Sequence, residues 1–273
     1  MAKKKLSRFT DKELLILIFL GLFFIGLIVQ FISENIDTII TILAILAGLI
    51  ITFYIFKFIL YMSKVKKYKQ TKYFFDTKVP YRMIHKYPGI WFESKVYDEL
   101  SNNFPNARLL TNLLIPRKDS VNEYSEIDIL FLHTSGLYVL ELKNYKGFIF
   151  GGLNDEKWNV GYKINNKRRT FEFLNPLIQN KKHIIDLNKH FSHEFLSKII
   201  FSEKTEMDSQ IDSVSYLKEF INKVSSLEKK YTLDELNEIY EEVKKINVYE
   251  KIGKHIERIK FNEEKYSKYK EKK

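Results

Sequence analysis

Two long apolar runs near the N-terminus constrain the fold more than any other feature. The first, LLILIFLGLFFIGLIVQFI over residues 14–32, has no charge and only Gln30 as a strongly polar residue. The second, IITILAILAGLIITFYIF over residues 39–56, is extended past Lys57 by further apolar residues. At about 1.5 Å per residue, each run crosses a hydrocarbon core of about 30 Å. Neither run has a polar face, so we predict two transmembrane helices, about 14–32 and 39–60, rather than buried helices of a soluble core.

The distribution of basic residues predicts how these helices are oriented. The link SENIDT, residues 33–38, is short and acidic, which predicts a transmembrane α-helical hairpin. Lysines and arginines flank the pair on both sides and are absent from the link; they are Lys3, Lys4, Lys5, Arg8 and Lys12 before it, and Lys64, Lys66, Lys67, Lys69 and Lys72 after it. The positive-inside rule then predicts a two-span protein of the cell membrane, with the basic tail 1–13 and the C-terminal domain in the cytoplasm.

Two other roles for the N-terminal region are disfavoured. A cleaved signal peptide does not fit, because the first run is too long, no small-residue cleavage site follows it, and a second span comes at once. A transporter does not fit, because the spans contain no Asp, Glu, His or Arg that would mark an ion path. We expect these spans to be an anchor in the lipid bilayer. A basic juxtamembrane linker follows over residues 63–88, and it either lies on anionic lipid or only connects the anchor to the next domain.

Composition narrows the chemistry of the remaining chain. The chain of 273 residues has no cysteine, which excludes disulfides, cysteine-based zinc sites and a thiol nucleophile, and fits a reducing compartment. Its net charge of +11 favours anionic partners, either nucleic acid or an anionic membrane surface. The chain is also rich in Asn, Ile, Tyr and Phe, so part of the lysine excess can be ordinary solvated surface. No particular protein partner is indicated.

From Tyr81 onward the pattern is that of a mixed α/β domain. Alternating apolar residues predict strands, and Asn175 followed by Pro176 predicts a helix start, as does the capping box that begins at Thr232. The elements that we expect, in chain order, are a helix after Pro88-Gly89, a strand ending at Pro116, strands at about 126–132 and 137–144, a short strand at 147–152, a hairpin over 157–173, a helix from 176, a strand over 195–202, and a helical C-terminal region, 205–273.

The hairpin EIDILFLHTSGLYVLELKN, residues 126–144, carries three charged groups that interrupt an apolar pattern. Side chains alternate along a strand, so an even-length turn brings Asp128, Glu141 and Lys143 together on one face. With a loop over His133–Gly136, Asp128 faces Glu141; with a two-residue loop at Ser135-Gly136, it faces Lys143.

Opposed carboxylates destabilise a sheet unless a cation lies between them. Oxygen ligands suit Mg²⁺ or Mn²⁺, and an adjacent lysine can stabilise developing negative charge. From Asp128, Glu141 and Lys143 alone, an ordinary cross-strand Asp–Lys pair remains an equal alternative.

A family resemblance adds to this pattern. Twelve residues separate Asp128 from the Glu-Leu-Lys that starts at Glu141, and this arrangement resembles the PD-(D/E)XK nuclease motif. The stretch from Gly89 to about Ser202, over a third of the chain, more specifically resembles the nuclease-related domain family, NERD. The matching segments are GIWFESKVYDEL, EIDILFLHTSGLYVLELKN, KGFIFGG followed by Trp158, and NPLIQNKKHIIDL. The resemblance implies a restriction-endonuclease-like fold, a mixed sheet flanked by helices, over residues 89–204.

The resemblance also implies roles for individual residues. Asp128 and Glu141 would hold the metal, Mg²⁺ or Mn²⁺, and Lys143 would assist the attacking water. Glu93, on the first helix of the domain, would be an outer acidic member of the site, and Gln179 would orient the substrate or a ligand.

Two details concern the match to this family. Gln179 and His183 have the spacing of the Q-x-x-x-Y element of some relatives, with His in place of Tyr. Ile127 stands before Asp128 where the motif has Pro, which leaves the chemistry intact.

Other candidate groups have weaker signals. The turn YKINNKRR would grip phosphates or be a solvated turn; its basic residues are Lys163, Lys167, Arg168 and Arg169. A metal cluster of His183, His190 and His193 is disfavoured, because the last two straddle an expected helix end without a placed acidic partner.

The sequence therefore predicts a membrane-anchored, metal-dependent nuclease that hydrolyses phosphodiester bonds in DNA or RNA. The alternative is a membrane-tethered module that binds nucleic acid or a partner with little or no catalysis.

Overall fold

The computed structural model describes residues 11–117, 124–164, 167–207 and 211–247. The chain divides into two compact units, Met1–Lys66 and Lys67–Lys273, and each is described here by itself.

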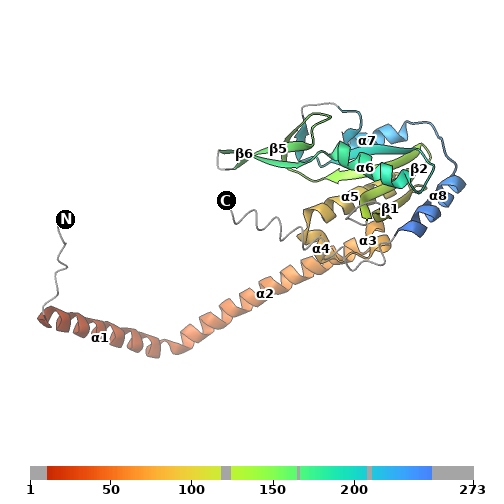
Figure 1. Cartoon of the computed structure of the whole chain (residues 1–273). Coiled ribbons are helices and arrows are strands. Elements are labelled where there is room, and N and C mark those ends of the chain that lie inside the picture. Colours follow the sequence, from red (N-terminus) through yellow and green to blue (C-terminus); the bar gives the residue numbers. More distant parts are fainter. Residues whose placement is uncertain (1–10, 118–123, 165–166, 208–210, 248–273) are drawn as a thin grey trace, which may run out of the picture. The chain divides into compact units, whose positions relative to one another are not determined.

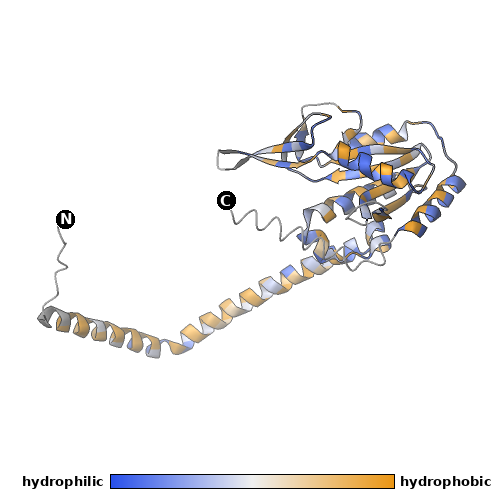
Figure 2. Cartoon of the chain, in the orientation of Figure 1, coloured by the Kyte–Doolittle hydropathy of each residue, from blue (hydrophilic) through white to orange (hydrophobic). Residues whose placement is uncertain are grey.

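The first unit consists of two long apolar helices. Helix α1 (Asp11–Glu34) and helix α2 (Ile36–Tyr68) are separated by a single residue, Asn35. Both are long and apolar enough to cross a membrane, and Figure 2 shows hydrophobic residues along most of each helix. None of the residues in either apolar stretch is buried. The two apolar helices are thus confirmed, with ends a few residues beyond the expected ones, and their pairing as a hairpin stays a prediction.

The stretch expected as a linker, residues 63–88, is folded. It contains the end of α2 and two short helices, α3 (Lys72–Thr77) and α4 (Tyr81–Lys86). Three of its residues, Tyr68, Tyr73 and Ile84, are buried in the main hydrophobic core of the second unit. The expectation was based on the lysines, whereas the tyrosines and isoleucine between them supply a buried face.

The second unit is built on a five-stranded mixed sheet (Figure 1). Its strands, in spatial order, are β1 (Arg108–Pro116), β2 (Tyr124–His133), β3 (Gly136–Lys143), β7 (Phe195–Phe201) and β9 (Val214–Tyr216). Strand β2 runs antiparallel to both β1 and β3, whereas β7 runs parallel to both β3 and β9. The parallel step from β3 to β7 requires a long connection, which supplies a helix and three of the four strands of a second sheet.

Helices cover both faces of this sheet (Figure 1). Helices α5 (Pro88–Asn103) and α7 (Leu217–Ser225) pack on the face that carries Ile129 and Phe131. Helices α6 (Pro176–Asn188) and α8 (Leu233–Ile246) pack on the face that carries Leu130 and Leu132. The two hydrophobic clusters on either side of the sheet give the domain its three layers.

A four-stranded sheet forms the second part of the domain. Its strands, in spatial order, are β6 (Lys167–Leu174), β5 (Lys157–Ile164), β4 (Gly147–Phe150) and β8 (Thr205–Met207). Its buried Trp158 stacks on Phe201 of β7, so a shared cluster joins the two sheets. Gly147 begins β4 with a φ of +124°, a conformation that L side chains rarely adopt, and a Cβ there would meet the carbonyl oxygen of Gly161 at 2.3 Å.

The predicted fold class, a mixed α/β domain preceded by two long apolar helices, is confirmed. The helix starts at Pro176 and after Thr232 are as expected, capped by the side chains of Asn175 and Thr232. The short strands β8 and β9 lie in the region expected to be helical. Residues 248–273 of that region lie outside the described part of the chain.

Candidate active site

The β2–β3 hairpin has one of the two registers that the sequence allowed. His133 pairs with Gly136 and Ile129 pairs with Leu140, with Thr134 and Ser135 at the turn. This register is the one in which Asp128 falls opposite Glu141. The turn is tighter than the four-residue loop considered above, because His133 and Gly136 themselves pair.

The sheet is interrupted at Asp128. Regular pairing with β3 ends at Ile129, and pairing with β1 skips Asn112, which has a left-handed φ of 51°. Ile127 and Leu130 belong to the same hydrophobic cluster, so the strict alternation that we assumed does not hold through Asp128. The Asp128 carboxylate instead accepts a hydrogen bond from the backbone N–H of Leu142, at 2.7 Å. The interruption thus turns this carboxylate toward the end of β3.

Lys143 links the second carboxylate to helix α6. Its Nζ donates to Glu141 Oε1 at 2.6 Å and to Gln179 Oε1 at 3.1 Å. Glu141 is only 2% exposed. Helix α6 is held against β3 because the Asn180 amide donates to the backbone oxygen of Val139 at 2.8 Å. The structure therefore brings Asp128, Glu141, Lys143 and Gln179 into one cluster.

Glu93 reaches the same cluster from α5. Its Oε1 accepts from Tyr73 Oη at 3.1 Å and from Asn112 Nδ2 at 3.0 Å. Thr111 Oγ1 also contacts this oxygen and lies 3.0 Å from the backbone oxygen of Asp128. Glu93 is thus connected to the backbone of Asp128 through one side chain of β1, in the outer position that we expected.

The two central carboxylates have opposite pKa shifts. Burial, followed by the negative charge of Glu141, raises the pKa of Asp128 well above its usual range. Burial also acts to raise the pKa of Glu141, but Lys143 and His183 outweigh it, so that the pKa of Glu141 is lowered. Burial acts to lower the pKa of Lys143, yet Glu141 and Asp128 raise it. The cluster therefore favours an ionised Glu141 and a charged Lys143, while Asp128 tends to hold a proton.

His183 faces the other oxygen of Glu141. Its Nε2 lies 3.4 Å from Glu141 Oε2, and its Nδ1 lies 2.6 Å from Ser125 Oγ. Both Nε2 and Oε2 are buried without a hydrogen-bond partner. The sequence identified His183 through its spacing from Gln179 and as a member of the disfavoured histidine cluster. It gave no signal for Ser125, nor for Tyr73, Thr111 and Asn112 around Glu93, because these residue types have no distinctive spacing.

The donor atoms fit a hard divalent cation. Glu141 Oε2 is a buried acceptor without a donor, adjacent to a second carboxylate. Among the residues that the structure describes, no three His, Cys, Asp or Glu side chains come close enough to hold a metal. Mg²⁺ commonly binds through one or two carboxylates and keeps several waters, so two carboxylates suffice for it.

The other candidate residues from the sequence lie outside the carboxylate cluster. The basic residues Lys163, Lys167, Arg168 and Arg169 belong to the β5–β6 hairpin of the four-stranded sheet, not to the sheet that carries the cluster. Arg169 is exposed, and the side chains of the other three lie outside the description. The ring of His190 donates to the backbone oxygen of Pro116 at 3.1 Å, and His193 lies 3.5 Å from Glu242.

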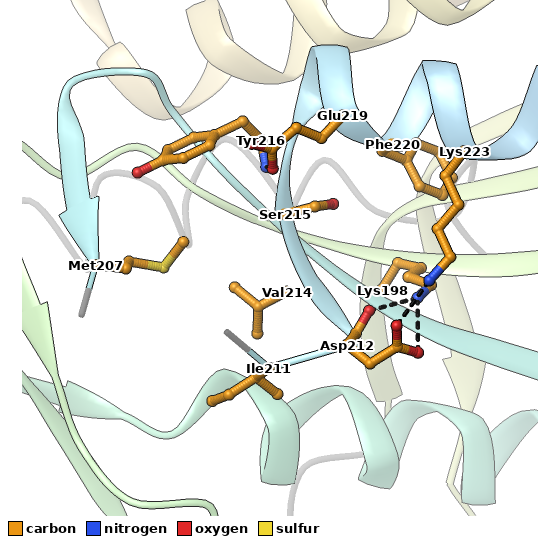
Figure 3. A pocket seen from close by; sticks show the side chains of 10 residues that line it. All are labelled: Lys198, Met207, Ile211, Asp212, Val214, Ser215, Tyr216, Glu219, Phe220 and Lys223. Carbon is orange, nitrogen blue, oxygen red and sulfur yellow. Dashed lines mark hydrogen bonds and ion pairs between the residues drawn. The ribbon is translucent and has the colours of Figure 1, made fainter. Parts of the chain in front are cut away.

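A separate pocket of about 700 Å³ lies beside α7 (Figure 3). Lys198 and Lys223 both point toward Asp212 there, and Lys223 pairs with its carboxylate at 2.7 Å. With Glu219 as the other acidic residue in the lining, the pocket has as many carboxylates as ammonium groups. It shares no residue with the carboxylate cluster.

Comparisons with known proteins give a family match over the part of the chain that carries this cluster. Residues 88–217, from the start of α5 to the first residue of α7, match the family model of NERD, the nuclease-related domain. The chain is also 27% identical over 135 residues to an uncharacterized protein of Bacillus anthracis, a match that covers 46% of this chain and 62% of that protein. The chain thus spans less than two thirds of that relative's length. No solved structure matches the chain.

Proposed function

From a chain that carries a nuclease-related domain over residues 88–217, we propose a metal-dependent nuclease that hydrolyses phosphodiester bonds in DNA or RNA. Its active site is the cluster of Asp128, Glu141 and Lys143. The observation that supports it best is the buried Glu141 Oε2, which has no hydrogen-bond donor although a second carboxylate and a lysine lie beside it. Such an arrangement is costly for folding alone and suits a bound cation.

In this proposal Asp128 and Glu141 hold Mg²⁺ or Mn²⁺. The cation, when bound, polarises the scissile phosphate and lowers the pKa of a bound water. The lowered pKa of Glu141 favours the ionised form that binds a cation, whereas the raised pKa of Asp128 disfavours that form. Lys143 remains charged and offsets the negative charge that grows on the phosphate as water attacks.

Glu93 and Gln179 act around this centre. Gln179 accepts a hydrogen bond from Lys143 and so holds the ammonium group in one position. Glu93 adds negative charge behind Asp128 and fixes its strand through Thr111. The basic residues of the β5–β6 hairpin contact phosphates farther along the nucleic acid.

The two apolar helices anchor the domain in the cell membrane. Lysines and arginines flank the two spans and are absent from the link, so by the positive-inside rule both ends of the chain would lie in the cytoplasm. The substrate would then be cytoplasmic nucleic acid close to the membrane.

Cleavage by the purified full chain in detergent tests the activity. We expect single- or double-stranded DNA or RNA to be cut with Mg²⁺ or Mn²⁺ and to remain intact with EDTA. Glu141→Gln is expected to reduce the rate by about 10²-fold or more, the scale of losing one electrostatic contributor to the transition state. Glu172→Gln is the matched control, because Glu172 is an exposed carboxylate on β6 whose ion pair with Lys157 is also exposed. Equal rates for the wild type and Glu141→Gln would contradict the proposal.

One observation favours the second candidate function, a binding module without catalysis. Lys143 already pairs with Glu141 at 2.6 Å, so the charge of Glu141 is compensated without any metal. That module would bind nucleic acid without cutting it. Its binding would not change on adding Mg²⁺ or on Lys143→Ala.

A further inference from the structure

We infer that helix α3 docks on the headgroup layer of an anionic bilayer, with Phe75 inserted at the lipid interface and the adjacent lysines paired with lipid phosphates. The inference rests on the membrane anchor of the proposed function and gives the second unit its own peripheral contact with the same membrane. We call Phe75 and its neighbours Lys72 and Lys78 the α3 surface.

The first support is an aromatic side chain that faces water. Phe75 is 68% exposed, whereas Tyr73 on the same helix is buried and Phe74 packs partly against the main hydrophobic core. The ammonium groups of Lys72 and Lys78 lie 5.7 Å and 4.6 Å from the centre of the Phe75 ring. A bilayer interface suits this combination, because an aromatic ring enters the acyl boundary while lysine amines stay with the phosphates.

The second support is the charge of the segment that contains α3. Residues 63–88 include seven lysines and one arginine, all exposed, but a single acidic residue, Asp76. The Asp76 carboxylate accepts hydrogen bonds from Lys72 at 2.7 Å and from Tyr97 Oη at 2.6 Å, so this negative charge is already paired. A basic cluster directly after an apolar span is complementary to anionic headgroups.

The third support is the short distance along the chain between the second apolar stretch and α3. Helix α2 continues without a break from Met62, the last residue of its apolar stretch, to Tyr68. Six residues of helix rise by about 9 Å, and the headgroup layer on each side of a bilayer is about 5–8 Å thick. When the apolar stretch spans the bilayer, the end of α2 therefore lies near the outer edge of the headgroup layer.

Tyr68 fixes the end of α2 to α3. Its ring packs against Phe74 with centroids 5.4 Å apart, and its hydroxyl donates to the backbone oxygen of Val79 at 2.8 Å. Tyr68 is itself buried in the main hydrophobic core. The second unit thus has little free chain with which to move away from the membrane, and α3 is held at the point where the span ends.

Site-directed spin labelling of the full chain in vesicles of phosphatidylcholine and phosphatidylglycerol tests this inference, because the chain has no cysteine of its own. A nitroxide at Phe75→Cys should collide more often with oxygen, which concentrates in lipid, than with a water-soluble nickel chelate. Leu153→Cys is the matched control, because Leu153 is also an exposed apolar residue of the second unit but lies in the turn before β5. Its label should show the opposite preference. Circular dichroism of each variant checks that it is folded.

A charge variant tests the contribution of the lysines. When Lys78→Gln is added to Phe75→Cys, the ratio of lipid-facing to water-facing label should fall about fivefold, the scale of one basic residue near an anionic surface. Lys182→Gln removes an exposed lysine from α6 instead and should leave the ratio unchanged. Vesicles of phosphatidylcholine alone should lower the ratio further. A ratio that responds to neither Lys78→Gln nor the loss of anionic lipid would overturn the inference.

A label at Ile50→Cys, within the apolar stretch of α2, separates this inference from the anchor on which it rests. If the label at position 50 lies in lipid while the label at position 75 meets the nickel chelate as often as the one at position 153, the anchor stands and the inference is wrong. A water-facing label at position 50 would overturn both. If an added oligonucleotide, rather than anionic lipid, immobilises the label at position 75, the α3 surface belongs to nucleic acid and the inference is also wrong.

Discussion

The two carboxylates of the cluster have different hydrogen-bond partners, and this difference affects the stability of the fold. Asp128 and Glu141 both lie beside Lys143, but Lys143 donates its hydrogen bond to Glu141. Asp128 receives a backbone N–H instead and is left as the carboxylate with the raised pKa. An unpaired carboxylate near a second one lowers the stability of the fold, which is a common cost of active sites.

Asp128→Asn should therefore stabilise the domain at neutral pH. The pKa of Asp128 is higher in the folded chain than in the unfolded chain, where it is about 3.9. Its contribution to stability is then fully present below the unfolded pKa and is lost as pH rises through the folded pKa. The introduced amide stays neutral and can still accept from Leu142, so the variant should gain up to about 1 kcal/mol at pH 7 and lose cleavage.

Thermal unfolding of the wild type and Asp128→Asn, followed by circular dichroism at pH 4 and pH 7, checks this. The advantage of the variant should grow with pH. A variant that is less stable than the wild type at pH 7 would contradict the opposite shifts of the two carboxylates.

The hydrogen bond that Lys143 donates to Gln179 can be tested by substitution. Gln179→Leu removes one of the two acceptors of Lys143, so cleavage should fall by about tenfold, the equivalent of one hydrogen bond to a charged group. Gln179→Glu keeps an acceptor at the same position and should retain more of the rate. Steady-state rates with saturating Mg²⁺ measure both variants. Wild-type rates for the leucine variant would show that Lys143 needs no such support.

At the scale of elements, the segment that follows α2 is fastened to the helix that carries Glu93. The backbone N–H of Tyr73 donates to Asp98 at 2.8 Å, and its hydroxyl donates to Glu93 at 3.1 Å. On the same two helices, Tyr97 donates to Asp76 at 2.6 Å. Helix α3 therefore holds α5 through contacts that end in the candidate site.

Tyr73→Phe tests whether this attachment reaches the chemistry. The variant should lose about 1 kcal/mol of stability, because one buried hydrogen bond is removed. It should also cut nucleic acid a few-fold more slowly, because Glu93 loses a donor. Tyr97→Phe is matched to it: the hydrogen bond that it removes joins the same helices but does not involve Glu93. It should lose similar stability and keep the wild-type rate. Equal cleavage rates for Tyr73→Phe and Tyr97→Phe would show that the contact of α3 with Glu93 does not affect the chemistry.

Elements with strong local signals were predictable from the sequence. The alternation in β2 and β3 and the caps of α6 and α8 depend on neighbours in the chain, and these elements are where we expected them. Strands β8 and β9 have three residues each, too few for a periodic pattern. Helices α3 and α4 were not predicted, because the many lysines around them suggested a solvated linker.

The residues at the centre of the site were also predictable from local sequence signals, but their tertiary contacts were not. Asp128, Glu141 and Lys143 lie on one hairpin, so strand geometry brings them together. The contact of Ser125 with His183 joins residues 58 positions apart, and the left-handed Asn112 interrupts a strand without any turn signal in its sequence. Such features depend on tertiary packing.

In the whole molecule, the proposed function combines a membrane anchor with a nucleic-acid enzyme. The two helices of the first unit are long and apolar enough to cross a membrane, and residues 88–217 of the second unit match the family model of the nuclease-related domain. Anchoring would confine the cleavage of nucleic acid to the surface of the membrane. The net charge of +11 suits both nucleic acid and anionic lipid.

The absence of cysteine makes the orientation easy to measure. We expect Asn35→Cys, in the link between α1 and α2, to react with a membrane-impermeant maleimide on intact cells that express the chain. Glu172→Cys, on β6, should react only after the cells are permeabilised, because the positive-inside rule places this domain in the cytoplasm. The reverse labelling pattern would show that the topology is the opposite of the expected one.

The central claim is that Asp128 and Glu141 together hold a divalent cation, and anomalous diffraction from crystals of the full chain soaked in Mn²⁺ measures this most directly. We expect one anomalous peak at the cluster, about 2.0–2.4 Å from a carboxylate oxygen of Asp128 and from Glu141 Oε2. An empty cluster at saturating Mn²⁺, with Lys143 still bonded to Glu141, would contradict it.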